Sequence, residues 1–317
     1  MTRLDRPIVI LGAARSGTTL LAETILARHP DVAYWPEPRV WRSADPYRRH
    51  DAFARAEATP AVAERIAGRF ADFARDRSRP RFMEKHPSNC FRMPFVLGVL
   101  PGARIVHVLR DGRDVALSAA VEWAGRTGDA LDSREKRDAS LPSRVWQTVR
   151  AEAEGESLLR RETLAALPFY GGRLAAYLRR QVFHTSTQPW GPRFPGIAET
   201  RRAYSLLETC AVQWDLSVRQ ALSGCRELEP DRYLEVRYED LVRNPVPVVR
   251  QVAAFLDLSG GAAAADALAA HVAVRAAPSW PARLAEADRT AVEDLIASTL
   301  LALGYPVGAP AGVPAHS

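Results

Sequence analysis

The sequence predicts an α/β fold in which a central, mostly parallel sheet lies between helices on both of its faces. Short apolar runs alternate with segments of helical periodicity along most of the 317 residues. This alternation is typical of parallel sheets with helical crossovers. The first apolar run, PIVIL, passes directly into the glycine-rich turn GAARSG and then into a helical pattern. A strand, a glycine-rich turn and a helix in this order predict a three-layer, P-loop-like arrangement.

The first strand is predicted at residues 7–11, a short apolar run that starts at a proline and precedes a glycine. Apolar residues then recur at helical spacing over residues 20–25. Ser16 and Thr18 are both candidates for the N-cap of this helix. A second amphipathic helix is indicated by apolar residues between positions 62 and 73, and we expect its apolar face to pack on the sheet.

The remaining elements continue the alternation as far as a glycine that ends the last helix. The pattern predicts strands at 81–85, 103–110 and 232–241, and helices at 115–123, 207–218 and 288–305. We therefore expect one domain over residues 1–305, followed by a flexible tail over 306–317 that is rich in Pro, Gly and Ala. Residues 125–202 are first charge-rich and then aromatic, which predicts an insertion or lid that contacts a variable substrate.

The charge balance is only mildly basic. Lys and Arg outnumber Asp and Glu by 43 to 37, and the basic residues are scattered rather than clustered. This composition is compatible with an anionic small ligand and predicts no nucleic-acid partner. Three cysteines, Cys90, Cys210 and Cys225, show no paired spacing, which favours a reducing compartment and argues against structural zinc.

No segment of the sequence reads as membrane-spanning. The alanine-rich run over 260–277 is interrupted by Asp266, His271 and Arg275, so it is too polar to cross a bilayer. The first strand begins a few residues from the start, and we expect no signal peptide. These features predict a cytoplasmic protein, and they indicate no particular oligomeric state.

The turn at residues 12–19 has the chemistry of an oxyanion-binding loop. Backbone N–H groups at the start of a helix, together with the helix dipole, favour a bound anion. Gly12 and Gly17 permit a tight path, and three hydroxyl side chains follow Arg15. A guanidinium provides a planar pair of donors that suits a tetrahedral oxyanion.

Two common nucleotide-binding patterns are not matched. The spacing does not fit the dinucleotide motif G-x-G-x-x-G, and the lysine that a nucleoside triphosphate requires after the second glycine is replaced by Thr18. A kinase would also place an aspartate at the end of a strand to hold magnesium. The strand at 103–110 ends instead in Arg110, at the edge of the sheet where ligands bind, which suggests a second anionic group on the ligand.

Three motifs in order resemble the sulfotransferases that use 3′-phosphoadenosine-5′-phosphosulfate (PAPS). They are GAARSGTTLL, VLRDGRDVALS and RYEDLVRNP, and the resemblance runs from Pro7 to Tyr305. The resemblance is to the bacterial branch and its tyrosylprotein-type relatives. The resemblance implies a P-loop-like fold, sulfuryl transfer from PAPS with release of adenosine 3′,5′-bisphosphate, and no metal requirement.

The resemblance also implies which residues bind the donor. The loop would bind the 5′-phosphosulfate, Arg110 and Ser118 would bind the 3′-phosphate, and Tyr238 would lie near the adenine. The loop residues concerned are Arg15, Ser16, Gly17, Thr18 and Thr19. From its position alone, Ser118 is an ordinary helix serine, and Tyr238 is an aromatic residue at a strand end.

Candidate catalytic residues come from two further segments. Glu37, in an extended segment, resembles the glutamate base of tyrosylprotein-type members, although its spacing from the loop differs by about one residue. His86 is the alternative base, because a neutral imidazole suits that task near pH 7. Lys85, in a Lys-x-Pro element, would stabilise the leaving oxygen together with Arg15. Without the resemblance, each of these residues also reads as an ordinary surface or structural side chain.

Two positions depart from the family pattern. Glu122 stands where tyrosylprotein-type members carry an arginine. The segment 277–284 resembles an Arg-Trp-Arg element of which only Trp280 and Arg283 remain. The adenosine contacts of this segment are therefore open.

Two other functions remain compatible with the sequence, namely a P-loop kinase with an altered loop and a nucleotide-binding protein without activity. The missing lysine disfavours the kinase, and the joint presence of Arg15, Glu37 and Lys85 disfavours the inactive protein. The acceptor is left open between a small phenol, a lipid, a glycan and a peptidyl tyrosine.

Overall fold

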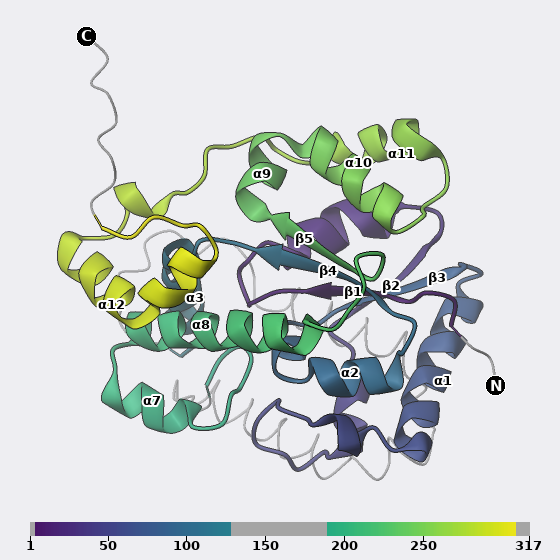
Figure 1. Ribbon diagram of the computed structural model, residues 1–317, viewed down its shortest axis with the longest axis horizontal. Helices are drawn as coiled ribbons and strands as arrows, with labels where there is room; N and C mark the ends of the chain where they lie inside the picture. The colour runs from purple at the N-terminus through teal and green to yellow at the C-terminus, as the bar shows by residue number, and fades with distance from the viewer. Residues whose placement is uncertain (1–3, 128–188, 309–317) are drawn as a thin grey trace.

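The computed structural model describes residues 4–127 and 189–308, and it confirms the α/β fold. Within these residues, five parallel strands form one sheet in the order β2-β3-β1-β4-β5 (Figure 1). The strands are β1 (Ile8–Leu11), β2 (Val32–Pro36), β3 (Arg81–Lys85), β4 (Arg104–Leu109) and β5 (Tyr233–Arg237). Because all five strands run in one direction, their carboxyl ends lie along the same edge of the sheet.

Both faces of the sheet are covered by helices. Successive residues of β1 point to opposite faces, and all four are fully buried. Ile8 and Ile10 pack with η1 (Leu20–Ile25), α9 (Tyr238–Arg243), α10 (Pro245–Phe255) and α11 (Gly261–Ala269). Val9 and Leu11 pack with α1 (Pro60–Asp76), α2 (Met93–Val99) and the end of α8 (Leu206–Cys225). Full burial of one such side chain contributes about 1.5–3 kcal/mol, so the alternation along β1 fixes which side each helix covers.

A third apolar cluster lies beyond the carboxyl end of β4. There α3 (Gly112–Thr127) and α12 (Glu286–Ala302) pack against α8, while α7 (Ile197–Ala203) lies before α8 (Figure 1). The short helical segments are η2 (Leu26–Arg28), η3 (Arg39–Ala44), η4 (Arg55–Glu57), η5 (Pro87–Phe91) and η6 (Trp280–Ala282). Of the predicted insertion at 125–202, residues 125–127 end α3, residues 189–196 precede α7, and residues 197–202 belong to α7. Its middle lies outside the described residues.

The strand predicted at 232–241 is wrong in its second half. It ends at Arg237, and Tyr238 begins α9. Glu239 and Asp240 occupy the first turn of that helix, where the helix dipole favours acidic side chains. The Glu239 carboxylate also accepts a hydrogen bond from the Asp111 backbone N–H at 2.9 Å, a contact that the local alternation does not reveal.

Two further local features differ from the sequence-based expectations. The pattern treats the residues before Glu37 only as extended, whereas Val32–Pro36 form the edge strand β2 and pair with β3. In the described part of the chain, neither Ser16 nor Thr18 caps the first helix. Its N-cap is Thr19, which makes no capping hydrogen bond through its side chain. The hydroxyl groups of the loop are therefore not used in helix capping.

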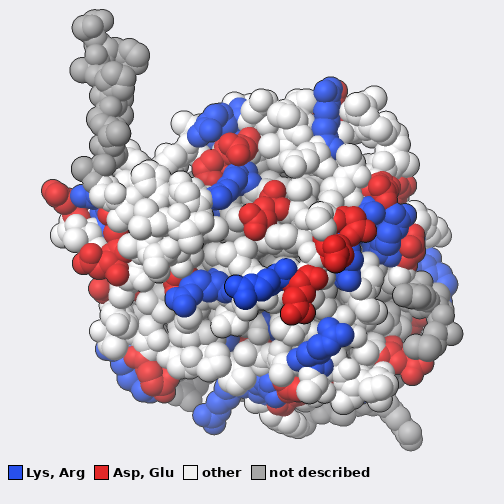
Figure 2. Space-filling view, viewed as in Figure 1, with Lys and Arg blue, Asp and Glu red and all other residues white. Residues whose placement is uncertain are grey.

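Charges of both signs are distributed over the surface. On the face drawn in Figure 2, basic and acidic side chains are interspersed, and many blue groups adjoin red ones. No helix among residues 4–127 and 189–308 is long and apolar enough to cross a membrane.

Candidate active site

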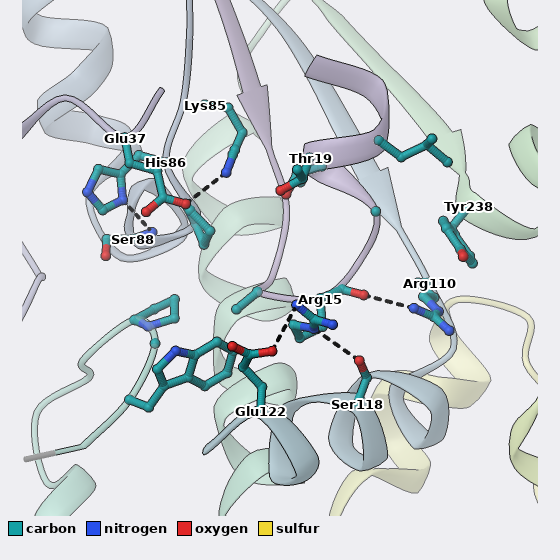
Figure 3. A pocket seen from close by; sticks show the side chains of 18 of the residues that line it. Arg15, Thr19, Glu37, Lys85, His86, Ser88, Arg110, Ser118, Glu122 and Tyr238 are labelled. Atoms are coloured by element: carbon teal, nitrogen blue, oxygen red, sulfur yellow. Dashed lines mark hydrogen bonds and ion pairs between the residues drawn. The ribbon is translucent and has the colours of Figure 1, made fainter. Parts of the chain in front are cut away.

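A cleft of about 1300 Å³ lies at the carboxyl edge of the sheet, where β1, β3 and β4 end (Figure 3). Its lining combines charges of both signs with an excess of basic groups. The basic residues are Arg15, Arg39, Arg42, Lys85, Arg110, Arg126, Arg193, Arg275 and Arg283, and the acidic residues are Glu23, Glu37, Asp51, Asp114 and Glu122. The cleft is therefore suited to an anionic ligand.

The glycine-rich loop lines one side of the cleft and requires its glycines. Gly17 has φ +96°, and a Cβ at this position would lie 2.3 Å from the Tyr238 ring. A Cβ at Gly12 would lie 2.7 Å from the carbonyl oxygen of Val108. Arg15 itself has φ +72°, which is uncommon for a residue with a side chain. The loop therefore holds a path that few other sequences allow.

We expect Gly17→Ala to disturb the loop and its contact with Tyr238. The positive φ and the short contact together should lower the free energy of unfolding by about 1–3 kcal/mol. The matched control is Gly68→Ala in α1, where a Cβ meets nothing within 4 Å. That control should be stabilising by about 0.5–1 kcal/mol. Urea unfolding of both variants measures the difference, and equal stabilities would contradict this account of the loop.

Arg15 lies against the middle of α3 and is held there by two side chains. Its Nε donates to Ser118 Oγ at 3.0 Å, and its guanidinium lies 3.5 Å from the Glu122 carboxylate (Figure 3). The loop and α3 are thus joined through the residues predicted to bind two different ends of one ligand. Glu122 adds a negative charge to this group, at the position where the resemblance would place an arginine.

Arg110 follows β4 and turns back to the loop. Its Nη1 donates to the backbone carbonyl of Arg15 at 2.9 Å, and its guanidinium lies 3.4 Å from Asp114. Its Nε is buried, and no hydrogen-bond partner for it is found among the described residues. A buried N–H without a partner is costly. The Arg110 side chain as a whole is 14% exposed and lines the cleft.

The Tyr238 ring packs against the glycine-rich loop. Only 6% of this residue is exposed, and its ring packs on Gly17 while the guanidinium of Arg110 lies 4.2 Å from its centre. Arg275 lies on the same ring at 5.6 Å. Tyr238 still lines the cleft, so the predicted contact with adenine stays a prediction alongside this packing role.

The strand pairing of β2 with β3 brings Glu37 to Lys85. The Glu37 backbone N–H donates to the Lys85 carbonyl at 2.9 Å, and Lys85 Nζ donates to Glu37 Oε1 at 2.8 Å (Figure 3). Lys85 is 3% exposed, whereas the Glu37 side chain is 53% exposed. Glu37 has φ +45°, a strained conformation of the kind that collects at functional sites.

Lys85 is also unusual because lysine is rare in this chain. The chain carries 43 Lys and Arg residues, and only Lys85 and Lys136 are lysine. An ammonium is a compact point charge, whereas a guanidinium is a broad planar group. A lysine buried at the end of β3 therefore indicates that this position requires the smaller cation.

His86 caps η5 and is fixed in its orientation. Its Nδ1 accepts a hydrogen bond from the Ser88 backbone N–H at 3.2 Å. Burial, followed by the positive charges of Arg92, Lys85 and Arg42, holds the pKa of His86 well below its ordinary value. The imidazole is therefore neutral near pH 7, and its proton is on Nε2, because Nδ1 acts as an acceptor.

Glu84 lies fully buried behind Lys85. It accepts hydrogen bonds from Asn89 Nδ2 at 2.6 Å and from Trp41 Nε1 at 3.3 Å. Burial raises its pKa to about 7, against the opposing influence of Arg92 and these hydrogen bonds. This network fixes the end of β3 and thereby the position of Lys85.

The structure brings together nearly all of the residues predicted from the sequence. Arg15, Gly17, Thr18, Thr19, Glu37, Lys85, His86, Arg110, Ser118 and Tyr238 line the cleft, but Ser16 is 1% exposed and is absent from its lining. The catalytic and binding roles of these residues stay predictions.

Two acidic residues that position the cleft wall, Asp111 and Asp114, were not predicted from the sequence. Asp114 accepts hydrogen bonds from the backbone N–H and the hydroxyl of Ser279, and Asp111 accepts one from Trp280 Nε1 at 3.0 Å. These contacts hold the 275–283 segment, so Trp280 acts as an anchor while Arg283 lines the cleft. The one sequence signal was the run RDGRD, which places two aspartates directly after a strand.

Asp51 was also missed, and no local pattern around it indicates a role. It is 3% exposed and links η3, η5 and the segment before α7 through hydrogen bonds to Arg42, Ser88 and Arg193. No three His, Cys, Asp or Glu side chains come together as metal ligands in the part of the chain that the structure describes.

Comparison with known proteins identifies one family. The sequence matches the model of the sulfotransferase family over residues 7–155 and 178–260, which is most of the chain. No curated protein matches the chain significantly. The relation to tyrosylprotein-type members stays a prediction.

Two solved structures share the fold. The sulfotransferase domain from the Curacin biosynthetic pathway is 15% identical, with a TM-score of 0.50 over 96% of this chain and 100% of that one. The sulfotransferase domain from the Synechococcus PCC 7002 olefin synthase is 17% identical, with a TM-score of 0.51 over 96% of this chain and 97% of that one. At these identities the likeness shows the fold alone.

Proposed function

The chain belongs to the sulfotransferase family and is a sulfotransferase, and we propose that PAPS is its sulfuryl donor. The acceptor supplies a hydroxyl or an amine, and adenosine 3′,5′-bisphosphate is the second product. One observation carries the proposal: a single cleft is lined by the Arg15 loop, by Arg110 with Ser118, and by the Glu37–Lys85 pair. These three groups would bind two anionic ends of the donor and carry out the transfer.

The cleft fits a donor with two separated anionic groups. The loop offers backbone N–H groups and the Thr18 and Thr19 hydroxyls at the start of a helix, where phosphate binds readily. Arg110 lines the cleft with a guanidinium whose side chain is 14% exposed, and Ser118 offers a hydroxyl. The loop would hold the 5′-phosphosulfate, and Arg110 with Ser118 would hold the 3′-phosphate.

In the proposed mechanism, Glu37 takes the proton of the acceptor hydroxyl while the acceptor oxygen bonds to sulfur. The bond between sulfur and the 5′-phosphate oxygen breaks, and its electron pair stays on that oxygen. Lys85 and Arg15 stabilise the negative charge that develops there. The exposed carboxylate of Glu37 can reach an acceptor, and the ammonium of Lys85 is already within 2.8 Å of it.

The hydrogen bonding of His86 supports Glu37 as the base. His86 Nδ1 accepts from Ser88, so the other nitrogen of the neutral ring carries a proton. A protonated Nε2 can donate a hydrogen bond to the acceptor, but it cannot remove the acceptor's proton. His86 is thus proposed to orient the acceptor.

We expect adenosine 3′,5′-bisphosphate to bind without magnesium, and Arg110→Ala to weaken this binding roughly 10- to 150-fold. This range corresponds to about 1.5–3 kcal/mol for a hydrogen bond to a charged group. Calorimetry measures the affinity for the bisphosphate and, for comparison, the affinities for ADP and ATP. The control variant is Arg226→Ala, because Arg226 is an exposed arginine at the end of α8. Equal or better binding of ATP, or a need for magnesium, would overturn the proposed donor and favour a kinase.

A further inference from the structure

Two guanidinium groups share one carboxylate at the Ser88 end of the cleft. Arg42 Nη2 donates to Asp51 Oδ1 at 2.5 Å, and Arg193 Nη2 donates to the same oxygen at 3.3 Å. Asp51 Oδ2 accepts from Ser88 Oγ and from the Arg193 backbone N–H, both at 2.8 Å. One negative charge therefore faces two positive charges, and this group of residues keeps a net charge of +1.

Both guanidinium groups retain donors for a ligand. Each carries five N–H donors, and within residues 4–127 and 189–308 the polar contacts of Arg42 and Arg193 side chains are to Asp51. Both side chains line the cleft, and they are 17% and 22% exposed. The arrangement can therefore bind an oxyanion without first breaking the ion pairs with Asp51.

The neighbourhood of this group is positive for a second reason. Arg92, which directly follows η5, is 1% exposed, and its Nη2 is buried without a partner among the described residues. The charges of Arg92, Lys85 and Arg42, added to burial, act together to disfavour the protonated form of His86 and hold its pKa low. An anion entering this end of the cleft would meet a site where positive charge exceeds negative charge.

This end of the cleft lies away from the proposed donor site. Figure 3 shows His86 and Ser88 on one side, and Arg110, Ser118 and Tyr238 on the other, with Glu37 and Lys85 nearer to His86. If the function proposed above holds, the phosphates of the donor bind to Arg110, Ser118 and the Arg15 loop. Arg42 and Arg193 then line the part of the cleft that the acceptor occupies.

We propose that Arg42 and Arg193 form a second oxyanion site, which binds a carboxylate or phosphate carried by the acceptor. The acceptor is accordingly an anionic hydroxy compound, whose charged group anchors in this site while its hydroxyl reaches Glu37. Asp51 is a positioning residue that fixes both guanidinium groups. This inference rests on the proposed function, because that function decides which side of the cleft the donor occupies.

The test titrates small anions into the enzyme saturated with adenosine 3′,5′-bisphosphate. Benzoate and phenyl phosphate are the anionic probes, and benzamide is the neutral probe of similar shape. We expect both anions to bind at least tenfold more tightly than benzamide. Arg42→Gln and Arg193→Gln should each lower this ratio of affinities at least fivefold. The nucleotide affinity should stay unchanged, and Arg226→Gln should alter neither. The tighter of the two anions identifies the anchoring group as carboxylate or phosphate.

Equal binding of benzamide and the anions, or full anion binding in both variants, would overturn the second site. Because Asp51 is buried, loss of an arginine can also weaken folding. Arg42→Lys keeps a positive charge and should retain anion binding better than Arg42→Gln, with thermal unfolding measured for each variant. If adenosine 3′,5′-bisphosphate does not bind, the proposal that PAPS is the donor is wrong. The same anion titration of the nucleotide-free wild type and variants then still tests the second site.

Discussion

Glu37→Gln is expected to lower kcat roughly 10²- to 10⁴-fold, the usual contribution of a positioned general base. Glutamine keeps an oxygen that can accept the hydrogen bond from Lys85 Nζ, now 2.8 Å from Glu37 Oε1. It removes the proton-accepting carboxylate and its negative charge. Because the hydrogen bond to Lys85 can persist, we expect the position of Lys85 and the affinity for adenosine 3′,5′-bisphosphate to be nearly unchanged. The measurement is transfer of radiolabelled sulfate from PAPS to an acceptor that the wild type uses, or to water.

His86→Asn separates the two candidate bases. An asparagine oxygen can accept the Ser88 N–H in place of Nδ1, so the cap on η5 should survive. We expect kcat to fall by less than about tenfold, because His86 is proposed to orient the acceptor rather than to take its proton. The exposed Glu64→Gln in α1 serves as the charge control. A large loss in His86→Asn with normal turnover in Glu37→Gln would reverse the assignment.

Lys85→Met is expected to lower kcat roughly 10²- to 10³-fold, the effect of removing one group that stabilises charge in a transition state. The methionine keeps the apolar stem inside β3 and removes the ammonium. Lys85→Arg should not restore activity, because a guanidinium is broader than the 3%-exposed position allows. Steady-state kinetics with PAPS gives kcat and KM for both variants, and Arg226→Met serves as the control.

The split between kcat and KM decides the role of Lys85. A fall in kcat that persists at saturating PAPS indicates stabilisation of the leaving oxygen. A rise in KM alone, with full kcat recovered at high PAPS, would show that Lys85 only binds the donor. The Glu37 carboxylate loses its partner in Lys85→Met, so thermal unfolding should be recorded with the kinetics.

Much of the donor side of the cleft could be predicted from local sequence. Gly12, Arg15 and Gly17 follow β1 within a few residues, and Arg110 directly follows β4, so their place at the carboxyl edge comes from the strand–turn–helix pattern. Ser118 lies two turns into α3 and needed the family resemblance. Ser16 fits the motif, yet it is 1% exposed and does not line the cleft, which the spacing alone could not reveal.

Local sequence patterns predict the alternation of strands and helices, the glycine-rich loop and the basic residue after β4. Periodicity and turn chemistry act within a few residues, so they are readable one segment at a time. Which distant side chains meet depends on the folded arrangement of the whole chain. The β2–β3 pairing brings Glu37 to Lys85, 48 residues away, and Asp51 binds Arg193 across 142 residues. Such contacts depend on strand order and on packing of whole helices, which no local pattern encodes.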